Sequence, residues 1–332
     1  MINVIIPTYN RNKCIEELLD NSLAYYNGDM FCFEIHDSSN NTLTEEAVYK
    51  FKNNYINFPL KYTRYPSDMM VDEKVTNAIR NNSKDYFYLC GDGVLCDYNK
   101  LENILIQDKY FDYIIINMEN IERIGYLGQD KEAIKNKTYT YIDNVLYIGK
   151  YYSHLTFWGA SIVSQKIFNY SMEKGILNKY LSKANPWWLA SVLAETIDVM
   201  REEGKNYKLS TIYLDCITGN KYKEGHMWSK GEKYYNYTFS LFNQAVALLP
   251  NNYDSVKHRI IKFFRDDSLA TKRFLLKLRM DGTLTYHLNK KYEKDIRFID
   301  GIYWYMIFLT IIPKTVLKTC YNTLKSIKKL LK

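Results

Sequence analysis

The chain has 332 residues, 47% hydrophobic and 16% aromatic, which is enough to bury the core of one large domain or of two unequal ones. Its six cysteines form neither CxxC pairs nor the Cys/His spacing of a zinc site, which excludes a small disulfide-stapled protein and a zinc finger. The net charge of +8 arises near the C-terminus, because residues 251–332 contain 18 Lys or Arg against 7 Asp or Glu.

The N-terminal part alternates between expected strands and helices. Residues 3–8 are a β-branched apolar run that predicts a strand, and no basic stretch precedes it as in a secretion signal, so we expect a cytoplasmic protein. Further expected elements are a helix containing Ile15 to Leu23, a strand at 31–36, a helix at 44–53, a strand at 59–65, a helix at 71–82 and a strand at 85–90. This alternation predicts an α/β fold with a mostly parallel, Rossmann-like sheet flanked by helices.

The middle of the chain continues this pattern, and helices dominate its end. The expected elements are a strand at 113–117, a segment crossing the sheet at 152–163, a helix at 165–172, a helix at 186–200, a strand at 209–216 and a loop at 218–231. For the helix at 186–200 we predict Asn185 as the N-cap and Pro186 as the first helical residue. We therefore expect a sheet domain at 1–231 and a helical region at 232–332.

Three polar clusters stand where expected strands end, at residues 8–11, 37–40 and 91–93. In a doubly wound sheet, ligands bind beyond the carboxyl ends of the strands. The predicted topology therefore brings these clusters together at one edge.

These residues resemble the family 2 glycosyltransferases of GT-A fold. The opening signature of that family is matched by Val4-Ile5-Ile6-Pro7-Thr8-Tyr9-Asn10-Arg11, its Asp after the second strand by Asp37, and its acidic metal motif by Gly91-Asp92-Gly93. The resemblance covers residues 1–95 well and 96–230 in outline. It implies a GT-A nucleotide-sugar-binding domain.

The resemblance also implies residues for the donor. The turn from Pro7 to Arg11 would hold a base and ribose, Asp37 would accept a hydrogen bond from uracil N3–H, and Asn77 and Arg80 would face the donor. The alternative interpretations are ordinary turn chemistry, a capping Asp and a solvated helix face.

Asp92 is the central candidate for a metal site. A Mn²⁺ or Mg²⁺ ion on carboxylate oxygen would offset the charge that develops on the departing diphosphate. The family motif supplies two or three carboxylates, whereas Gly91 and Gly93 flank a single one here. Either His226 on the late loop completes a metal site, or cationic side chains such as Lys223 or Lys230 hold the leaving group.

An inverting transfer needs a general base to deprotonate the acceptor hydroxyl. In the family, this carboxylate lies about a hundred residues beyond the metal motif, at the start of a helix. Here that helix begins with Trp187 and Trp188, and the nearest acidic candidates are Glu195 and Asp198. The two tryptophans are expected to form a platform for an acceptor sugar, with core packing as the alternative.

The C-terminal end has the pattern of a membrane-surface segment. The apolar run 302–312 is shorter than the roughly 20 residues that a spanning helix needs. Beyond Pro313, apolar residues and lysines fall on different faces of a helix, and no acidic residue follows Asp300. This predicts a basic amphipathic helix on anionic lipid. A packing helix or a contact in a homo-oligomer is the alternative, and the apolar face argues against nucleic acid.

The sequence therefore predicts an inverting glycosyltransferase that moves a sugar from a UDP-sugar to a lipid-linked or polysaccharide acceptor. We expect it to work in the synthesis of a bacterial capsule or other surface glycan, peripherally on the inner face of the cell membrane. One alternative is a nucleotidyltransferase, which the lack of any glycine before Gly28 disfavours. Another is a catalytically degenerate glycosyltransferase-like membrane scaffold or partner subunit.

Overall fold

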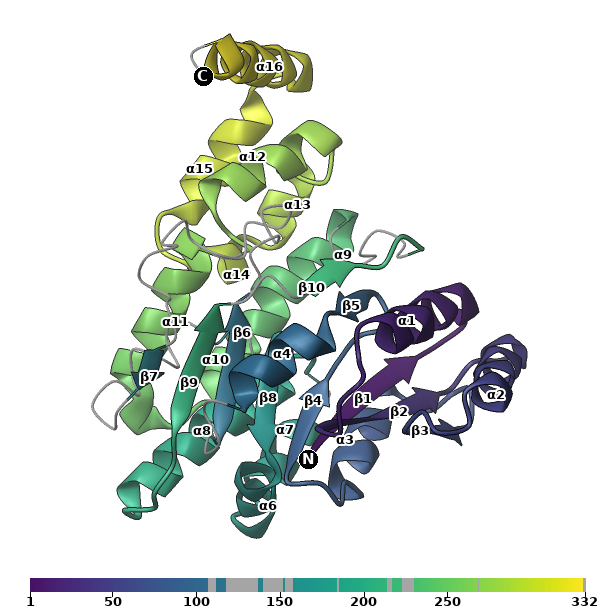
Figure 1. Cartoon of the computed structure of the whole chain (residues 1–332). Helices are drawn as coiled ribbons and strands as arrows, with labels where there is room; N and C mark the ends of the chain where they lie inside the picture. Colours follow the sequence, from purple (N-terminus) through teal and green to yellow (C-terminus); the bar gives the residue numbers. More distant parts are fainter. Residues whose placement is uncertain are drawn as a thin grey trace. The chain divides into compact units, whose positions relative to one another are not determined.

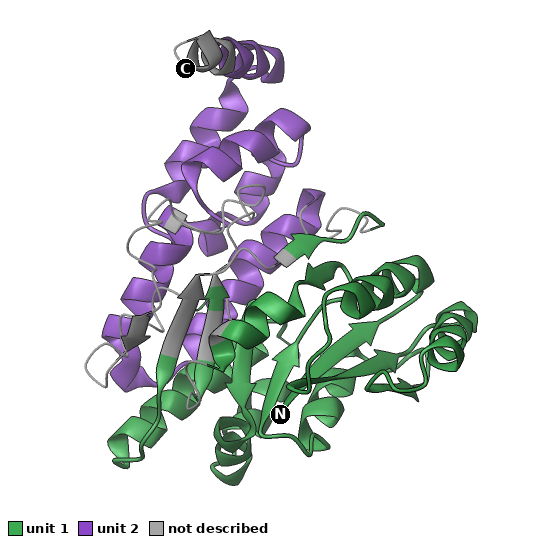
Figure 2. Ribbon diagram, in the orientation of Figure 1, with its two compact units in different colours: residues 1–121, 129–223 green, residues 122–128, 224–332 purple. Residues whose placement is uncertain are grey.

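The computed structural model describes residues 1–106, 112–117, 137–139, 152, 158–183, 185–213, 217–222, 230–267 and 269–330. Two compact units make up the chain (Figure 2). Unit 1 comprises residues 1–121 and 129–223, and unit 2 comprises residues 122–128 and 224–332.

Unit 1 is built on an eight-stranded sheet in the order β3-β2-β1-β4-β8-β6-β9-β7 (Figure 1). The strands are β1 (Ile2–Thr8), β2 (Phe31–Asp37), β3 (Leu60–Arg64), β4 (Tyr86–Leu89), β6 (Tyr113–Asn117), β7 (Lys137–Tyr139), β8 (Ser161–Ser164) and β9 (Leu209–Tyr213). β1 pairs in parallel with β2 and β4, and β2 pairs in parallel with β3. β1 is buried along its whole length, which explains why its sequence is a continuous apolar run rather than an alternating one.

The helices of unit 1 connect these strands. They are α1 (Asn12–Ala24), α2 (Leu43–Asn54), α3 (Val71–Arg80), α4 (Tyr98–Leu105), α6 (Gln165–Glu173), α7 (Ile176–Leu181) and α8 (Trp188–Glu202). In α1, Cys14, Ile15, Leu18 and Leu19 form the buried face, at the spacing of an amphipathic helix. Aromatic rings fill the core beside β2: Phe33 meets Tyr98 edge-on with 5.0 Å between the ring centroids.

The predicted α/β architecture is confirmed, with differences in detail. The sheet is mixed, because β8 runs antiparallel to both β4 and β6. Helices α4 and α7 and the small antiparallel pair of β5 (Val94–Cys96) and β10 (Ile217–Gly219) were not predicted from the sequence. The predicted caps of α8 were wrong: the helix begins at Trp188 with Trp187 as its N-cap, since Asn185 accepts a hydrogen bond from the Trp187 amide in a turn before the helix.

Unit 2 is helical throughout its described residues. Its helices are α9 (Gly231–Tyr235), a π-helix (Asn236–Leu241), α10 (Phe242–Leu248), α11 (Asp254–Asp267), α12 (Lys272–Asp281), α13 (Tyr286–Lys291), α14 (Glu293–Arg297), α15 (Ile302–Ile311) and α16 (Lys314–Leu330), with a 3₁₀ turn at Asn251–Tyr253. The rings of Phe242 and Phe264 stack with centroids 3.8 Å apart. Buried Tyr235 donates a hydrogen bond to Asn289. Unit 2 therefore has its own packed core.

In the part of the chain that the structure describes, no helix combines the length and the apolar character needed to cross a membrane. α15 has ten residues, so its apolar run of 302–312 forms a short helix as expected. Its C-terminal end is held by Arg279 of α12, whose guanidinium donates to the carbonyl oxygens of Leu309, Thr310 and Ile312.

These carbonyl groups have no partner within α15, because the last turn of a helix leaves its acceptors unsatisfied. We expect Arg279→Met to lower the free energy of unfolding by about 2–4 kcal/mol, since several charge-assisted hydrogen bonds are lost at once. Urea denaturation followed by far-ultraviolet circular dichroism measures this change. Lys277→Met, an exposed position on the same helix, is the matched control; equal stability of the two variants would contradict the bracing role of Arg279.

Candidate functional site

The predicted polar clusters meet at the carboxyl edge of the parallel strands of unit 1. Thr8 at the end of β1 lies in register with Asp37 at the end of β2. β4 ends at Leu89, and the following residues form a turn closed by the hydrogen bond from the Val94 amide to the Gly91 carbonyl. This turn presents Asp92 between Gly91 and Gly93, beside β1.

Asp92 accepts hydrogen bonds from two residues of the polar cluster that follows β1, Thr8 and Arg11. Its Oδ2 accepts a hydrogen bond from Thr8 Oγ1 at 2.9 Å, and its Oδ1 accepts one from Arg11 Nη1 at 2.9 Å. The Asp92 side chain is buried, whereas that of Arg11 is 40% exposed. The guanidinium therefore lies between a buried carboxylate and solvent.

The turn from Pro7 to Arg11 has a defined shape. Asn10 has a left-handed backbone with φ of +54°, which asparagine tolerates better than most residues. Its amide donates to Ser39 Oγ at 2.7 Å, and its side-chain oxygen accepts from the Asn40 amide at 3.1 Å. Tyr9 precedes it with an exposed ring. The turns after β1 and β2 thus hold each other at the edge.

Asp37, which the resemblance implied would bind uracil, is enclosed by neighbouring side chains. Its side chain is fully buried, and its oxygens accept hydrogen bonds from Ser39, Tyr62 and Arg64. Arg64 also donates to the carbonyl oxygens of Ser39 and Asn41. In this arrangement Asp37 fixes the turn after β2 and leaves no exposed oxygen for uracil.

Lys74 on α3 is a site residue that sequence reasoning missed. Only 2% of it is exposed, and its Nζ donates to the Thr8 carbonyl at 2.7 Å and to Ser38 Oγ at 2.8 Å. Burial lowers the pKa of Lys74, while the charges of Asp37 and Asp92 oppose that shift. Nothing in the local sequence distinguishes this lysine from the exposed ones, because its partners are 36 and 66 residues away.

The start of the late loop also reaches this edge. Asn220 follows β10 and is buried; its side-chain amide donates to the backbone carbonyls of Cys14 and Asp92. Its own amide donates to the Gly93 carbonyl. The predicted residues Lys223 and His226 lie beyond this point, outside the described residues.

The described residues do not fit a divalent cation at Asp92. Among them, no group of three or more His, Cys, Asp or Glu side chains is placed to hold a metal ion. Both oxygens of Asp92 already accept hydrogen bonds, and Arg11 provides the counter-charge. A cation at Asp92 would lie next to the positive charge of the Arg11 guanidinium.

Asn77 and Arg80 lie on α3, as the sequence predicted. Arg80 is exposed near the C-terminal end of this helix and donates to Asn178 of α7 at 3.4 Å. α3 follows β3, so its first turn is the one at the carboxyl edge. Neither side chain contacts Thr8, Arg11 or Asp92 in the described hydrogen bonds.

Glu195 and Asp198, both on α8, contact residues of α7 and α8. Glu195 accepts hydrogen bonds from Lys179 and Tyr180, and Asp198 forms a 2.7 Å ion pair with Arg201. At 1.5 Å per residue, they lie about 10 and 15 Å along α8 from Trp188. Each carboxylate therefore has a charged partner, and their role as a general base stays a prediction.

The two tryptophans at the start of α8 are buried. Trp187 is fully enclosed and stacks on Tyr152, with an interplanar angle of 3°. Trp188 Nε1 donates to Asp72 Oδ1 at 3.0 Å. Neither ring is exposed as a platform for an acceptor sugar would be. Both rings pack in the core, which was the alternative interpretation.

Asp72 itself was not predicted. It stands in the first turn of α3, two residues before Lys74, and is partly buried against Trp188. Burial raises the pKa of Asp72, and the hydrogen bond from Trp188 opposes that shift. Asp72 thus lies in the first turn of α3 and is hydrogen-bonded to Trp188, the first residue of α8.

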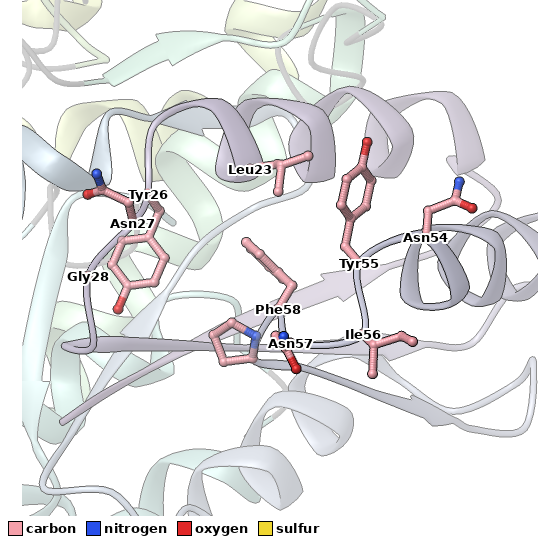
Figure 3. A pocket seen from close by; sticks show the side chains of 10 residues that line it. Leu23, Tyr26, Asn27, Gly28, Asn54, Tyr55, Ile56, Asn57 and Phe58 are labelled. Carbon is pink, nitrogen blue, oxygen red and sulfur yellow. The ribbon is translucent and has the colours of Figure 1, made fainter.

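A separate pocket lies at the other edge of the sheet. It is lined by the segments that precede β2 and β3, including Tyr26, Asn27, Tyr55 and Phe58 (Figure 3). These segments lead into the amino ends of the strands. The pocket is therefore distinct from the edge that carries Asp92.

Comparison with known proteins identifies the fold. No family model matches the chain. The abequosyltransferase RfbV of Salmonella typhimurium is 34% identical over 94 residues, and this match spans only about a quarter of its length, 27% of each chain.

Two solved structures match nearly the whole chain. TarS of S. aureus, residues 1–349, has a TM-score of 0.54 at 14% identity, covering 97% of this chain and 91% of that one. The mannosyltransferase PcManGT of Pyrobaculum calidifontis, solved with GDP-Man and Mn²⁺, has a TM-score of 0.51 at 13% identity, covering 97% and 86%. A further TarS structure contains UDP-GlcNAc and has a TM-score of 0.52 at 16% identity. The chain has the GT-A fold, as its sequence predicted.

The burial of Asp198 makes its contribution to stability depend on pH. Burial raises the pKa of Asp198 to about 6, although Arg201 opposes the shift. The folded chain therefore holds this proton more tightly than the unfolded chain, whose Asp has a pKa of about 3.9. The stability that this group contributes is complete below the lower value and is lost as the pH rises through the higher one.

We expect Asp198→Asn to remove this loss. Relative to wild type, the variant should gain about 2 kcal/mol of unfolding free energy between about pH 4 and about pH 7. Urea denaturation at both pH values measures the difference, with Glu173→Gln, an exposed carboxylate on α6, as the control. A difference that does not change with pH would show that Asp198 titrates normally.

Proposed function

We propose that the chain is a glycosyltransferase that moves a sugar from a nucleotide diphosphate donor to a glycan or lipid-linked acceptor, with inversion, in bacterial surface polysaccharide synthesis. The observation that carries this proposal is the meeting of Thr8, Arg11 and Asp92 at the carboxyl edge of a GT-A sheet. The partial match to an abequosyltransferase supports the reaction class.

For the donor, we propose a UDP-sugar. The TarS structure with UDP-GlcNAc supports this choice. A GDP-sugar is the alternative, because the similar mannosyltransferase was solved with GDP-Man. Since Asp37 is enclosed, we place the base and ribose instead on the exposed ring of Tyr9 and the turn at Asn10. The exposed guanidinium of Arg11 is the described cation nearest to Asp92 and would meet the diphosphate.

For the general base, we propose Asp72 in place of Glu195 and Asp198. The family resemblance puts a base carboxylate at the start of the helix that is α8 here, where this chain has Trp188. Asp72 lies against that tryptophan, at the start of α3.

A degenerate, scaffold-like domain is the second interpretation. The single carboxylate in the Gly91–Gly93 turn favours it. The hydrogen bonds from Thr8 and Arg11 to that carboxylate favour an enzyme, because they hold a cation in place where the donor diphosphate would bind. Turnover of a donor distinguishes the two.

The decisive assay is the release of UDP or GDP from a panel of UDP- and GDP-sugars, with water or an added glycan as acceptor. We expect Asp72→Asn to lower kcat about a hundredfold, because the base is lost, and to leave the affinity for free nucleotide unchanged. Glu73→Gln, an exposed carboxylate on the same turn, should behave as wild type. Unchanged kcat in Asp72→Asn would remove Asp72 from the reaction, and no turnover of any donor would favour the scaffold.

We propose that α15 and α16 of unit 2 bind peripherally to a membrane surface. Trp304, Phe308 and Ile311 recur every three or four residues on α15 and are 67%, 58% and 69% exposed. The next helix, α16, contains Lys314, which is partly exposed, and Lys318, which is exposed. We define these five residues as the lipid face. Exposed aromatic and aliphatic side chains followed along the chain by lysines are typical of proteins that rest on anionic headgroups, where lipid-linked acceptors are found.

We expect the chain to sediment with vesicles of phosphatidylcholine and phosphatidylglycerol but weakly with phosphatidylcholine alone. Each lysine near such a surface contributes about 1 kcal/mol, so Lys314→Glu/Lys318→Glu should lower the partition coefficient by about tenfold or more. Trp304→Ser/Phe308→Ser should also lower it. Lys50→Glu/Lys52→Glu on α2 is the control of equal charge. Unchanged sedimentation together with a concentration-dependent dimer would assign the lipid face to a second copy of the chain.

A further inference from the structure

We infer that Asp92 holds the guanidinium of Arg11 against the diphosphate of the donor, so that donor binding does not require a divalent cation. This inference rests on the proposed function, because it concerns how the same edge binds a nucleotide. It departs from the expectation of a Mn²⁺ or Mg²⁺ site.

The first support is the coordination of Asp92. A hard cation binds through carboxylate oxygen at 2.0–2.6 Å, and a single carboxylate must offer it an accessible oxygen. Here Oδ2 is taken by the Thr8 hydroxyl and Oδ1 by the Arg11 guanidinium, and the carboxylate is buried beneath them. The geometry is that of an arginine anchor.

The second support is the balance of charge along this edge. Two carboxylates, Asp37 and Asp92, are paired with the guanidinium groups of Arg64 and Arg11. Lys74 adds a third cation, close enough to both carboxylates for each to raise its pKa. Each of the two carboxylates thus already has a cationic partner within the chain. The part of the Arg11 guanidinium that reaches solvent would attract a diphosphate.

The third support is the chemistry of the donor. The leaving diphosphate needs positive charge that is fixed in place before the glycosidic bond breaks. Arginine supplies a planar set of N–H donors that matches two phosphate oxygens, and Asp92 holds that plane in position. Lys74 is a positioning residue: through the Thr8 carbonyl and Ser38 it fixes the turns that carry Arg11 and the neighbouring polar groups.

The test is calorimetric titration of the full chain with UDP and with GDP, first in excess EDTA and then in excess Mn²⁺. We expect the Kd for the preferred nucleotide to be the same within about twofold in both buffers. Arg11→Gln should weaken binding at least about tenfold, and Arg11→Lys, which keeps the charge, should recover part of it. Lys52→Gln on α2 is the control for loss of an exposed charge.

The alternatives give different results. Binding that appears only with Mn²⁺, is lost in Asp92→Asn and persists in Arg11→Gln would overturn this inference and leave the proposed function standing. An absence of nucleotide binding in every buffer would overturn the proposed function as well. If Arg11→Gln does not fold, as judged by its thermal melt, the comparison of EDTA with Mn²⁺ on the wild-type chain still decides the matter.

Discussion

The carboxyl ends of β1 and β4 are tied together by the hydrogen bond from Thr8 to Asp92. The strands are parallel and adjacent, and Ile5 of β1 pairs with Leu89 of β4, so Thr8 and Asp92 each lie three residues beyond this pair. The Thr8–Asp92 contact fixes the distance between the two turns, and the ion pair to Arg11 closes the arrangement from the solvent side. The remaining polar groups of the site are placed by these two turns.

Buried charge is the main energetic cost of this edge. An unpaired carboxylate or ammonium group in a protein interior is strongly destabilising, whereas a paired and hydrogen-bonded one is tolerated. Asp37 meets this condition through Ser39, Tyr62 and Arg64, and Lys74 meets it through Thr8 and Ser38. Such a network holds the backbone turns in a single conformation, which is what a site for a flexible diphosphate requires.

Unit 2 contributes chemistry of a different kind. Its helices enclose their own aromatic core, and Arg279 ties α12 to the end of α15. One face of α15 is exposed, and Trp304 is the largest side chain on it; its ring lies 5.2 Å from the Arg297 guanidinium. These exposed side chains are the observation on which the proposed lipid face rests.

The sequence by itself determined the local elements of unit 1 and the order in which they occur. The apolar runs of β1 and β2 and the helical spacing in α1 depend on nearest neighbours along the chain, and these signals can be read without a structure. The same holds for Thr8, Arg11 and Asp92, since each stands where a strand ends. Only the tertiary structure decided what these side chains touch. Lys74 and Asp72 become site residues through contacts 66 and 116 positions away, and Trp187 and Asp37 become enclosed through packing that no local pattern records. Burial and partner choice are properties of the folded chain, because they depend on which distant segments the core brings together.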